Sequence, residues 1–315
     1  MNLLKAFTAV YSYTTPEVHA IIGELTKSYP RELIDEGWVR SDLTKIQDEA
    51  FAALISLRGD EVPGLSDFEF RYPTYGSDHA ICEYMTHLKV DEGLNSIYIL
   101  ENDYEGYVER AKSRGLEPII IKPTALPKEL TTGVWFISNP SARDGNVLPD
   151  RLIADLLDAG HRVVYDLAYL GTTDRCEFDL RHEGIDAALV SLSKPYGLFS
   201  HRIGLSLFRR PVPSLIANEL WFKNIFGLKL ATEVLTRIDG PSYANRYKAQ
   251  QNEIVTQLRN ESGLPLSVSD AFLLAHITET DAESLTAEQK ATLSRYKRGS
   301  RYRFCLTPFF ANRES

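Results

Sequence analysis

The sequence has few cysteines, no long hydrophobic run and no excess of positive charge. Its 315 residues include only three cysteines, Cys82, Cys176 and Cys305, which lie far apart and form no CxxC pair. Such sparse cysteines provide neither a disulfide framework nor the ligand spacing of a metal site, and they suit a reducing compartment. We therefore expect no bound metal and a cytoplasmic location.

The absence of hydrophobic runs and of basic clusters argues against membranes and nucleic acids. No stretch approaches the roughly 18 apolar residues of a membrane-spanning helix. Residues 1–20 contain a short apolar patch, but not the long hydrophobic segment and cleavage site of a signal peptide. The net charge of −8 would be repelled by nucleic acid and by anionic membranes. We expect none of these partners.

What the sequence does contain is an alternation of short apolar runs with helical patterns. The runs are apolar throughout, as expected for strands that helices cover on both faces. A mostly parallel α/β sheet is therefore predicted, sandwiched by helices. The predicted strands are 96–100, 117–121, 133–138, 162–166, 186–191 and 202–208.

The flanking regions differ from this central part. Residues 1–70 have helical patterns with polar breaks, and 212–259 are again helical. From about residue 264, two strand-like pieces surround a polar helix, which is enough for a small α+β lobe. We predict an N-terminal segment at 1–45, a large domain at 46–240 and a small C-terminal domain at 241–315.

Three successive predicted strands end in polar residues. The first is followed by Asn139, the second ends in Asp166 with Tyr169 close behind, and the third ends in Ser191 with Lys194 close behind. In an open parallel sheet, ligands bind beyond the carboxyl ends of the strands. Taken singly, Asn139 suits a turn, Asp166 suits a helix cap and Lys194 suits a surface loop. Together they favour a binding site.

Lys194 and Arg202 lie in the apolar stretch SLSKPYGLFSHRIGLSLF (191–208), where an unpaired charge is costly. A lysine amine whose pKa is lowered by burial can form a Schiff base with an aldehyde cofactor. Pyridoxal phosphate needs such an amine, a carboxylate at its ring nitrogen, donors to its phenolate oxygen and a site for its phosphate.

The polar residues at the strand ends match these requirements. Asp166 can meet the ring nitrogen, and Asn139 and Tyr169 can meet the phenolate oxygen. Ser191 and Arg202 can bind the phosphate. The N-terminus of the helix that follows Gly76, for which Ser77 is the expected N-cap, adds free N–H groups.

The same segments carry a resemblance to a known family. SLSKPYGLFSHRIG resembles the lysine motif of the class I/II aminotransferases, pyridoxal-phosphate enzymes of fold type I, which runs Ser-x-Ser-Lys and later x-Arg-x-Gly. YDLAYLG resembles their Asp-x-Ala-Tyr segment, and ISNPSARDG their Asn-Pro-Thr-Gly segment. YGSDHAICEYMTHL resembles their phosphate-binding turn, which implies roles for Gly76, Ser77 and Asp78. The resemblance spans roughly residues 70–310.

Two further roles follow from the resemblance. ENDYEGY is similar to the segment that stacks an aromatic ring on the cofactor, which would be Tyr104, although Tyr104 could also simply start a helix. RYRFCLTP resembles the strand whose arginine binds the substrate carboxylate. Its register favours Arg303, with Arg301 as the competitor, and the guanidinium suits a bidentate carboxylate contact.

The resemblance implies an aminotransferase that moves an amino group between an amino acid and a 2-oxo acid, with Lys194, Asp166 and Tyr169 as catalytic residues. It also implies a homodimer, in which Tyr11, Tyr13 or Tyr72 could reach the neighbouring site. The chain departs from the family by lacking a DLSxGEP-like opening and by having SARDG in place of Thr-Gly. A lyase, decarboxylase or oxidase with the same cofactor, or a non-catalytic homologue that binds it, therefore stays open.

Overall fold

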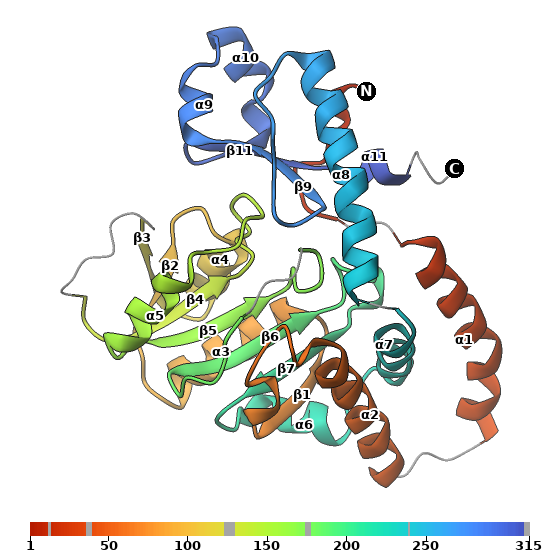
Figure 1. The fold of residues 1–315 in the computed structure, drawn as a ribbon. Coiled ribbons are helices and arrows are strands. Elements are labelled where there is room, and N and C mark those ends of the chain that lie inside the picture. Colours follow the sequence, from red (N-terminus) through yellow and green to blue (C-terminus); the bar gives the residue numbers. More distant parts are fainter. Residues whose placement is uncertain (12–13, 36–39, 123–129, 174–177, 239, 312–315) are drawn as a thin grey trace.

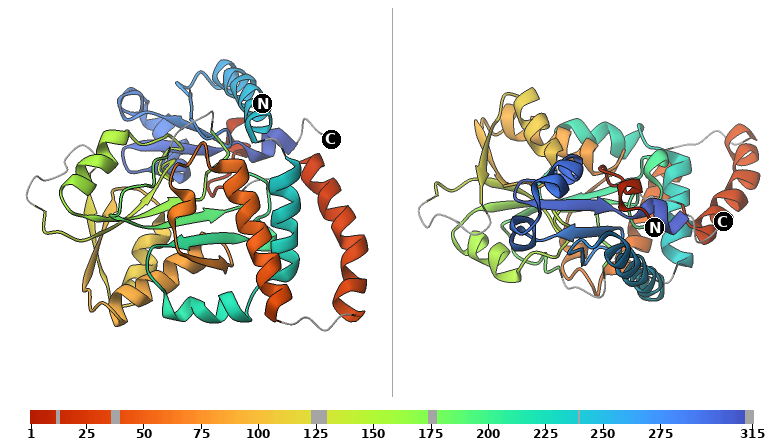
Figure 2. Two further views of the ribbon diagram at one scale, coloured as in Figure 1. Left: turned by 60° about the horizontal axis from the view of Figure 1, so that its bottom comes forward. Right: turned by 90° about the horizontal axis from the view of Figure 1, so that it is seen from above.

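The computed structural model describes residues 1–311 apart from 12–13, 36–39, 123–129, 174–177 and 239. Tyr13 and Cys176 lie outside the described residues. The chain builds a seven-stranded sheet with helices on both faces and a separate four-stranded sheet (Figure 1). The right-hand view of Figure 2 shows the smaller sheet and the N-terminus on the same side of the larger sheet.

The larger sheet has the strand order β1-β7-β6-β5-β4-β2-β3. The pairs from β3 to β6 are parallel, whereas β7 pairs antiparallel with both β6 and β1. The predicted mostly parallel α/β sheet is confirmed. Its strands are β1 (Phe70–Thr74), β2 (Ser96–Leu100), β3 (Glu117–Ile121), β4 (Val134–Ser138), β5 (Arg162–Leu167), β6 (Ile185–Ser191) and β7 (Gly204–Phe208).

Two details of this sheet differ from the expectation. The sequence analysis does not predict β1, because it is short, contains Pro73 and lies at an edge, where proline is tolerated. The predicted strand 202–208 begins only at Gly204. Arg202 has a φ of 51°, which lies in the left-handed region and cannot continue a strand.

The central strands are buried on both faces, which explains why they are apolar throughout. Along β4, for example, Phe136 packs in the core on one face, while Trp135 and Ile137 pack in the core on the other. Helix α3 (Ser77–Val90) covers the first of these faces, with Tyr84 and Leu88 buried. The helix starts at Ser77, but its N-cap is Gly76 rather than the expected Ser77, and no side chain caps it.

The remaining helices surround the sheet and connect it to the smaller one. Helices α1 and α2 pack against α7, and the long α8 leads to the smaller sheet (Figure 1). Residues 212–259, predicted as helical, are divided among several helices. These elements are α1 (Pro16–Asp35), α2 (Arg40–Arg58), α4 (Glu105–Ser113), α5 (Asp150–Asp158), α6 (Ile216–Leu220), α7 (Ile225–Arg237) and α8 (Gly240–Ser262).

The smaller sheet is antiparallel, with the strand order β10-β11-β9-β8. The two predicted strand-like pieces and the helical segment between them are present. The N-terminal segment joins this sheet, because Phe7 and Cys305 exchange backbone hydrogen bonds of 3.1 and 3.0 Å. The elements are β8 (Ser267–Val268), β9 (Leu274–Ile277), α9 (Glu279–Glu283), α10 (Ala287–Thr292), β10 (Lys297–Arg298), β11 (Arg301–Cys305) and α11 (Thr307–Ala311).

No helix in the described part of the chain is both long and apolar enough to span a membrane.

The buried central strands predict where the sheet is most sensitive to substitution. We expect Leu189→Ala in β6 to lower the free energy of unfolding by about 2–5 kcal/mol, because Leu189 is fully buried and its loss leaves a cavity. Ile120→Ala on the edge strand β3 is the control, since Ile120 is 46% exposed. Urea unfolding of the two variants measures the difference. Equal losses would contradict this assignment of the core.

Candidate active site

A cavity of about 380 Å³ lies between the carboxyl ends of the parallel strands and the smaller sheet. Strand ends of the larger sheet form its floor, and the starts of α3 and α4, the N-terminal segment and the smaller sheet contribute to its walls. Nine of the predicted site residues line it: Ser77, Asp78, Tyr104, Asp166, Tyr169, Ser191, Lys194, Arg202 and Arg303.

Asp166 lies at the floor of the cavity and is almost completely buried. One carboxylate oxygen accepts a hydrogen bond from the Tyr107 hydroxyl at 2.9 Å, and the other accepts from the Ala168 N–H at 3.0 Å. Burial raises the pKa of Asp166, while the charge of Lys194 and the Tyr107 hydrogen bond oppose that rise. The two hydrogen bonds fix the carboxylate in one orientation.

Lys194 follows β6 and extends into the same cavity. Its Nζ lies 4.3 Å from the centre of the Tyr169 ring, which is itself buried. Burial lowers the pKa of Lys194, Arg303 and Arg202 lower it further, and Asp166 acts in the opposite direction. A neutral amine is therefore easier to reach here than on the surface, which is the state a nucleophilic or basic lysine needs.

An anion-binding corner forms where α3 begins. Gly76 has a φ of +86°, and a Cβ built at this residue would lie 2.7 Å from Nη2 of Arg202. The Arg202 guanidinium donates to the Tyr75 carbonyl at 2.7 Å and also lines the cavity. The uncapped N-terminus of α3 leaves backbone N–H groups free beside this cation, and both favour a bound anion.

Ser193 is a cavity residue that the sequence analysis does not include. Its Oγ is buried and has no hydrogen-bond partner among the described residues, whereas Ser191 Oγ accepts from the Ser193 N–H at 3.3 Å. A buried hydroxyl without a partner is costly unless a ligand supplies one. The second serine of the Ser-x-Ser-Lys motif is the signal that could have identified it.

Asp103 is a buried carboxyl of the cavity, besides Asp166, that the sequence analysis does not include. It follows β2, lines the cavity and accepts hydrogen bonds from the N–H and hydroxyl of Ser138 and from the Tyr104 N–H. Burial raises its pKa to about 6, against the effect of these hydrogen bonds, and the charge of Asp166 adds to the rise. These bonds hold the start of α4 against the end of β4.

Tyr104 and Asp78 form one side of the cavity. The Tyr104 hydroxyl is 3.3 Å from an Asp78 oxygen, and the same carboxylate pairs with Arg110 at 3.0 and 3.2 Å. The Tyr104 ring meets the Tyr107 ring edge to face, with centroids 5.3 Å apart. Tyr104 is thus both the N-cap residue of α4 and a cavity residue. Starting a helix and contacting a ligand in the cavity therefore do not exclude each other.

Asn139 is not where the sequence analysis expects it. Its amide donates to the Tyr165 hydroxyl at 2.7 Å and its oxygen accepts from the Leu148 N–H at 2.9 Å. The side chain therefore ties the loop after β4 to the core and does not line the cavity. Its neighbour Ser138 does.

The two arginines of β11 differ in their surroundings. Arg301 donates to buried Asp144 at 2.6 Å and does not line the cavity. Arg303 lines the cavity and donates to the carbonyls of Ala142 and Thr8, while its Nε is buried without a partner. Of the pair, only Arg303 has a donor left for a ligand in this cavity.

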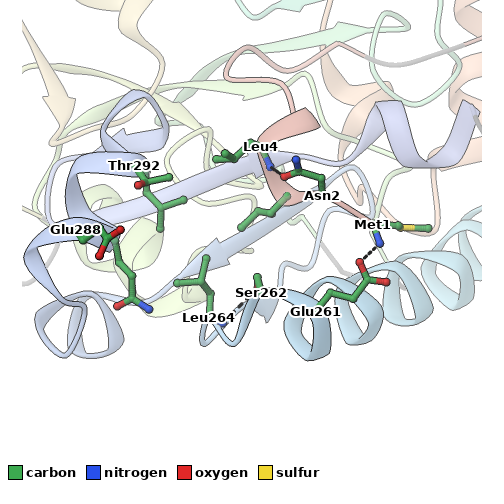
Figure 3. Close-up of a pocket in the computed structure, with 11 residues that line it drawn as sticks. Met1, Asn2, Leu4, Glu261, Ser262, Leu264, Glu288 and Thr292 are labelled. Atoms are coloured by element: carbon green, nitrogen blue, oxygen red, sulfur yellow. Dashed lines mark hydrogen bonds and ion pairs between the residues drawn. The ribbon is translucent and has the colours of Figure 1, made fainter.

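The N-terminal segment closes the cavity from the side of the smaller sheet. Ala9, Val10 and Tyr11 line it, and the Tyr11 ring packs against Phe199 with centroids 5.5 Å apart. The sequence analysis finds no family-like opening segment, yet these residues occupy the mouth of the site. Another hollow, of about 430 Å³ beside Met1 and Glu261, contains none of the predicted site residues (Figure 3).

Comparison with known proteins gives the fold. No protein-family model and no curated protein sequence matches the chain. Solved structures match over nearly its whole length. MppP soaked with its product 2-ketoarginine is 16% identical with a TM-score of 0.71, and the match covers 98% of this chain and 95% of that one. An aminotransferase from Mycobacterium tuberculosis is 17% identical with a TM-score of 0.69, covering 95% and 85%.

This chain has the aminotransferase fold of fold type I. A PLP-bound C-S lyase from Staphylococcus hominis shares it, at 11% identity and a TM-score of 0.71, with 97% of this chain and 87% of that one covered. The fold that the motif resemblance implies is therefore confirmed. The similar structures include aminotransferases and a lyase, so the fold alone does not determine which reaction this chain catalyses.

The buried Asp103 predicts a pH dependence of stability. Burial raises its pKa to about 6 in the folded protein, against 3.8 for an ordinary aspartate. The folded state therefore binds a proton at Asp103 more tightly than the unfolded state does. As the pH rises from about 4 to about 6, the loss of this proton should lower the free energy of unfolding by up to about 3 kcal/mol.

Urea unfolding across this pH range, compared between the wild-type protein and Asp103→Asn, measures the effect. The variant should lose this part of the pH dependence, and the exposed Asp158→Asn should keep it. Parallel curves for the wild-type protein and Asp103→Asn would show that Asp103 does not titrate in this window.

Proposed function

We propose that this chain is a pyridoxal-phosphate-dependent aminotransferase that moves an amino group between an amino acid and a 2-oxo acid. The observation that carries the proposal is one cavity that holds the Lys194 amine, the buried Asp166 carboxylate and the anion-binding corner at Gly76 and Arg202. The similar structures include a PLP-bound enzyme and aminotransferases, which supports the same reading.

The cavity residues fit pyridoxal phosphate in size and in chemistry. A volume of about 380 Å³ lies in the range of roughly 300–1,000 Å³ that is typical of small-molecule sites. The Ser193 hydroxyl lacks a partner, the start of α3 is uncapped, and Gly76 leaves space beside Arg202 that a Cβ would fill. Ser77, Ser193 and Arg202 would hold the phosphate. Asn139 is left out of the proposed contacts, because its side chain does not line the cavity.

Asp166 would hold the cofactor through its ring nitrogen. Tyr107 and the Ala168 N–H orient the carboxylate, so that it accepts a hydrogen bond from a protonated ring without rearrangement. When bound, the cofactor supplies an electron sink for the carbanion formed at the substrate α-carbon. The cationic ring would also offset the cost of burying the Asp166 charge.

Lys194 would hold the cofactor covalently through its Nζ until the amino group of the substrate takes its place. The freed Nζ would then act as the acid–base residue that takes the proton from the substrate α-carbon and later gives it up. The lowered pKa of Lys194 increases the neutral fraction that can accept this proton. Burial raises the pKa of Tyr169, so its hydroxyl keeps its proton and can donate to the cofactor phenolate oxygen.

Arg303 would bind the substrate carboxylate, and Tyr104 would stack on the cofactor ring. Arg303 lines the same cavity as Lys194, and its Nε has no hydrogen-bond partner among the described residues. A guanidinium that backbone carbonyls already orient loses little entropy when it binds a carboxylate.

A second candidate is elimination or another reaction at the same carbanion. The C-S lyase of this fold has a TM-score of 0.71, as high as that of any structure named above. A non-catalytic homologue is disfavoured, because Lys194, Asp166, Tyr169 and Arg202 all line one cavity.

The proposal includes a homodimer in the cytoplasm. Large apolar side chains are exposed near the mouth of the cavity, at Tyr11, Tyr75 and Phe199, and also at Trp221 and Phe222 in the loop after α6. Such exposure favours a protein interface. A second copy of the chain would cover these side chains and complete the site. Tyr72 is buried and bonds within its own chain, which leaves Tyr11 as the better placed described candidate to reach a partner.

Covalent attachment tests the role of Lys194. We expect the wild-type protein with pyridoxal phosphate to show a visible absorption band, and borohydride reduction followed by peptide mapping to find the added mass on Lys194. Lys194→Ala should lose the attachment and reduce turnover by at least about 1,000-fold, since nucleophile and base are lost together. Lys112→Ala, at an exposed lysine, is the matched control. Attachment elsewhere would overturn the assignment.

A half-reaction tests transamination itself. Addition of single amino acids to the loaded protein, without a 2-oxo acid, should convert the visible band to a near-ultraviolet band and release one equivalent of 2-oxo acid. A release of pyruvate with ammonia, sulfide or another leaving group would instead establish the lyase alternative. Protein that binds no pyridoxal phosphate would end the proposal as a whole.

A further inference from the structure

Arg58, the last residue of α2, is a buried cation that does not line the cavity. Its Nη1 pairs with Glu61 at 2.7 Å, and its Nη2 donates to the Tyr196 hydroxyl at 2.9 Å. Tyr196 is itself fully buried and comes two residues after Lys194 in the chain. Arg58 therefore connects the end of α2 with the turn that carries Lys194.

Two glycines make room for this guanidinium. A Cβ built at Gly171 would lie 2.8 Å from Cζ of Arg58, and a Cβ built at Gly240 would lie 3.0 Å from its Nη1. A side chain at either position would push the guanidinium away. Gly171 follows Tyr169 in the loop after β5, and Gly240 starts α8. The guanidinium therefore contacts the Tyr169 loop and the start of α8 as well as the Lys194 turn.

The burial of this cation is not explained by stability alone. Burial by itself would lower the pKa of Arg58, but Tyr196 and Glu61 raise it, so the guanidinium stays charged. A buried ion pair contributes little net stability, because the loss of hydration offsets the attraction between the charges. What the planar guanidinium provides is a fixed direction for each hydrogen bond. The pair therefore indicates a positional role.

The Lys194 turn has two further contacts, which hold only its backbone. The Tyr243 hydroxyl in α8 donates to the Pro195 carbonyl at 2.9 Å. The Thr14 hydroxyl donates to the Gly197 carbonyl at 3.0 Å. Neither contact orients a side chain of the turn, whereas the guanidinium holds the hydroxyl end of the ring between them.

We propose that Arg58 is a positioning residue that holds Lys194 over the Tyr169 ring. Nζ of Lys194 lies 4.3 Å from the centre of that ring. The guanidinium contacts both loops concerned, at Tyr196 on one side and at Gly171 on the other. A misplacement of about 1 Å at a reacting group can reduce a rate about 100-fold. The inference rests on the proposed function for the reaction that Lys194 performs.

The rate at which pyridoxal phosphate attaches to Lys194 tests this role on the full chain freed of cofactor. Arg58→Gln should slow the appearance of the visible band by at least about tenfold, because the amine is no longer held in place. Deoxypyridoxine phosphate has a methyl group instead of the aldehyde and needs no lysine. Its affinity for the variant should stay within about twofold of the wild-type value. A general loosening of the cavity would weaken both processes.

Further variants separate position from stability. Arg58→Lys keeps the charge and should restore part of the attachment rate. Tyr196→Phe removes only the acceptor, so combining it with Arg58→Gln should add little to the loss. Arg162→Gln is the matched control, since Arg162 pairs with Glu92 and Asp186 at the opposite end of β5 from the cavity. It should leave the attachment rate within about twofold.

Steady-state kinetics of the loaded protein give a second measurement. Arg58→Gln should reduce kcat by about ten- to hundredfold and leave KM within about twofold, because the proposed carboxylate contact at Arg303 is unchanged. Urea unfolding shows whether each variant is folded. An unchanged attachment rate in folded Arg58→Gln, or an equal loss in Arg162→Gln, would overturn the inference.

The two proposals fail in different ways. Amide hydrogen exchange of residues 192–198 needs no cofactor, and it should be at least about tenfold faster in Arg58→Gln than in the wild-type protein. If Lys194 binds no pyridoxal phosphate but this difference is found, the proposed function is wrong and the Arg58 contact still holds the turn. If Lys194 binds the cofactor while Arg58→Gln changes neither attachment nor exchange, the positioning role alone is wrong.

Discussion

The geometry of the site depends on one constraint, which is that parallel strands end at the same edge of their sheet. Strands β4, β5 and β6 run parallel, so Ser138, Asp166 and Ser191 meet at that edge although 53 positions separate the first from the last. Helices on both faces exclude water from the sheet. The edge is therefore the place where polar side chains can gather beside a cavity without disturbing the core.

Charge placement is the second organising feature. Four cations, Lys194, Arg202, Arg298 and Arg303, line a cavity that also contains four carboxyl groups. Asp166, Asp78 and Asp103 are held by Tyr107, by Arg110 and by hydrogen bonds from Ser138, and Glu105 lies 3.3 Å from Arg298. The Nε groups of Arg298 and Arg303 have no hydrogen-bond partner among the described residues. This imbalance in hydrogen bonding, rather than in charge number, is what makes the cavity suited to anionic ligands. It also connects the proposed phosphate corner with the proposed substrate side.

The same contacts connect the two sheets. The Thr8 carbonyl accepts from both arginines of the smaller sheet, and Phe7 pairs with Cys305 of β11. The N-terminal segment is therefore part of the wall that positions Arg298 and Arg303. A change in this segment would therefore displace Arg298 and Arg303 without a direct contact to Lys194.

The sequence alone determined the periodic elements and the local motifs. Strands such as 96–100 and the buried face of α3 follow from runs of apolar residues. The lysine segment identified Lys194 and Arg202 as cavity residues, and the YDLAYLG segment identified Asp166. These features depend on neighbours in the chain. β1 escaped prediction because Pro73 is compatible with a strand only at an edge, and the edge position is itself a tertiary property.

The tertiary structure decided everything that depends on distant partners. Asn139 has the right type and position for the cavity, but its amide is taken by Tyr165 and Leu148. Asp103 lies in the ENDYEGY segment but was not predicted as a site residue, and Arg298 lies outside the motifs. Both reach the cavity because β2 and β10 end there. Whether a polar side chain binds a ligand depends on whether the fold has already used its donors and acceptors. That competition is settled by contacts between segments that are remote in sequence.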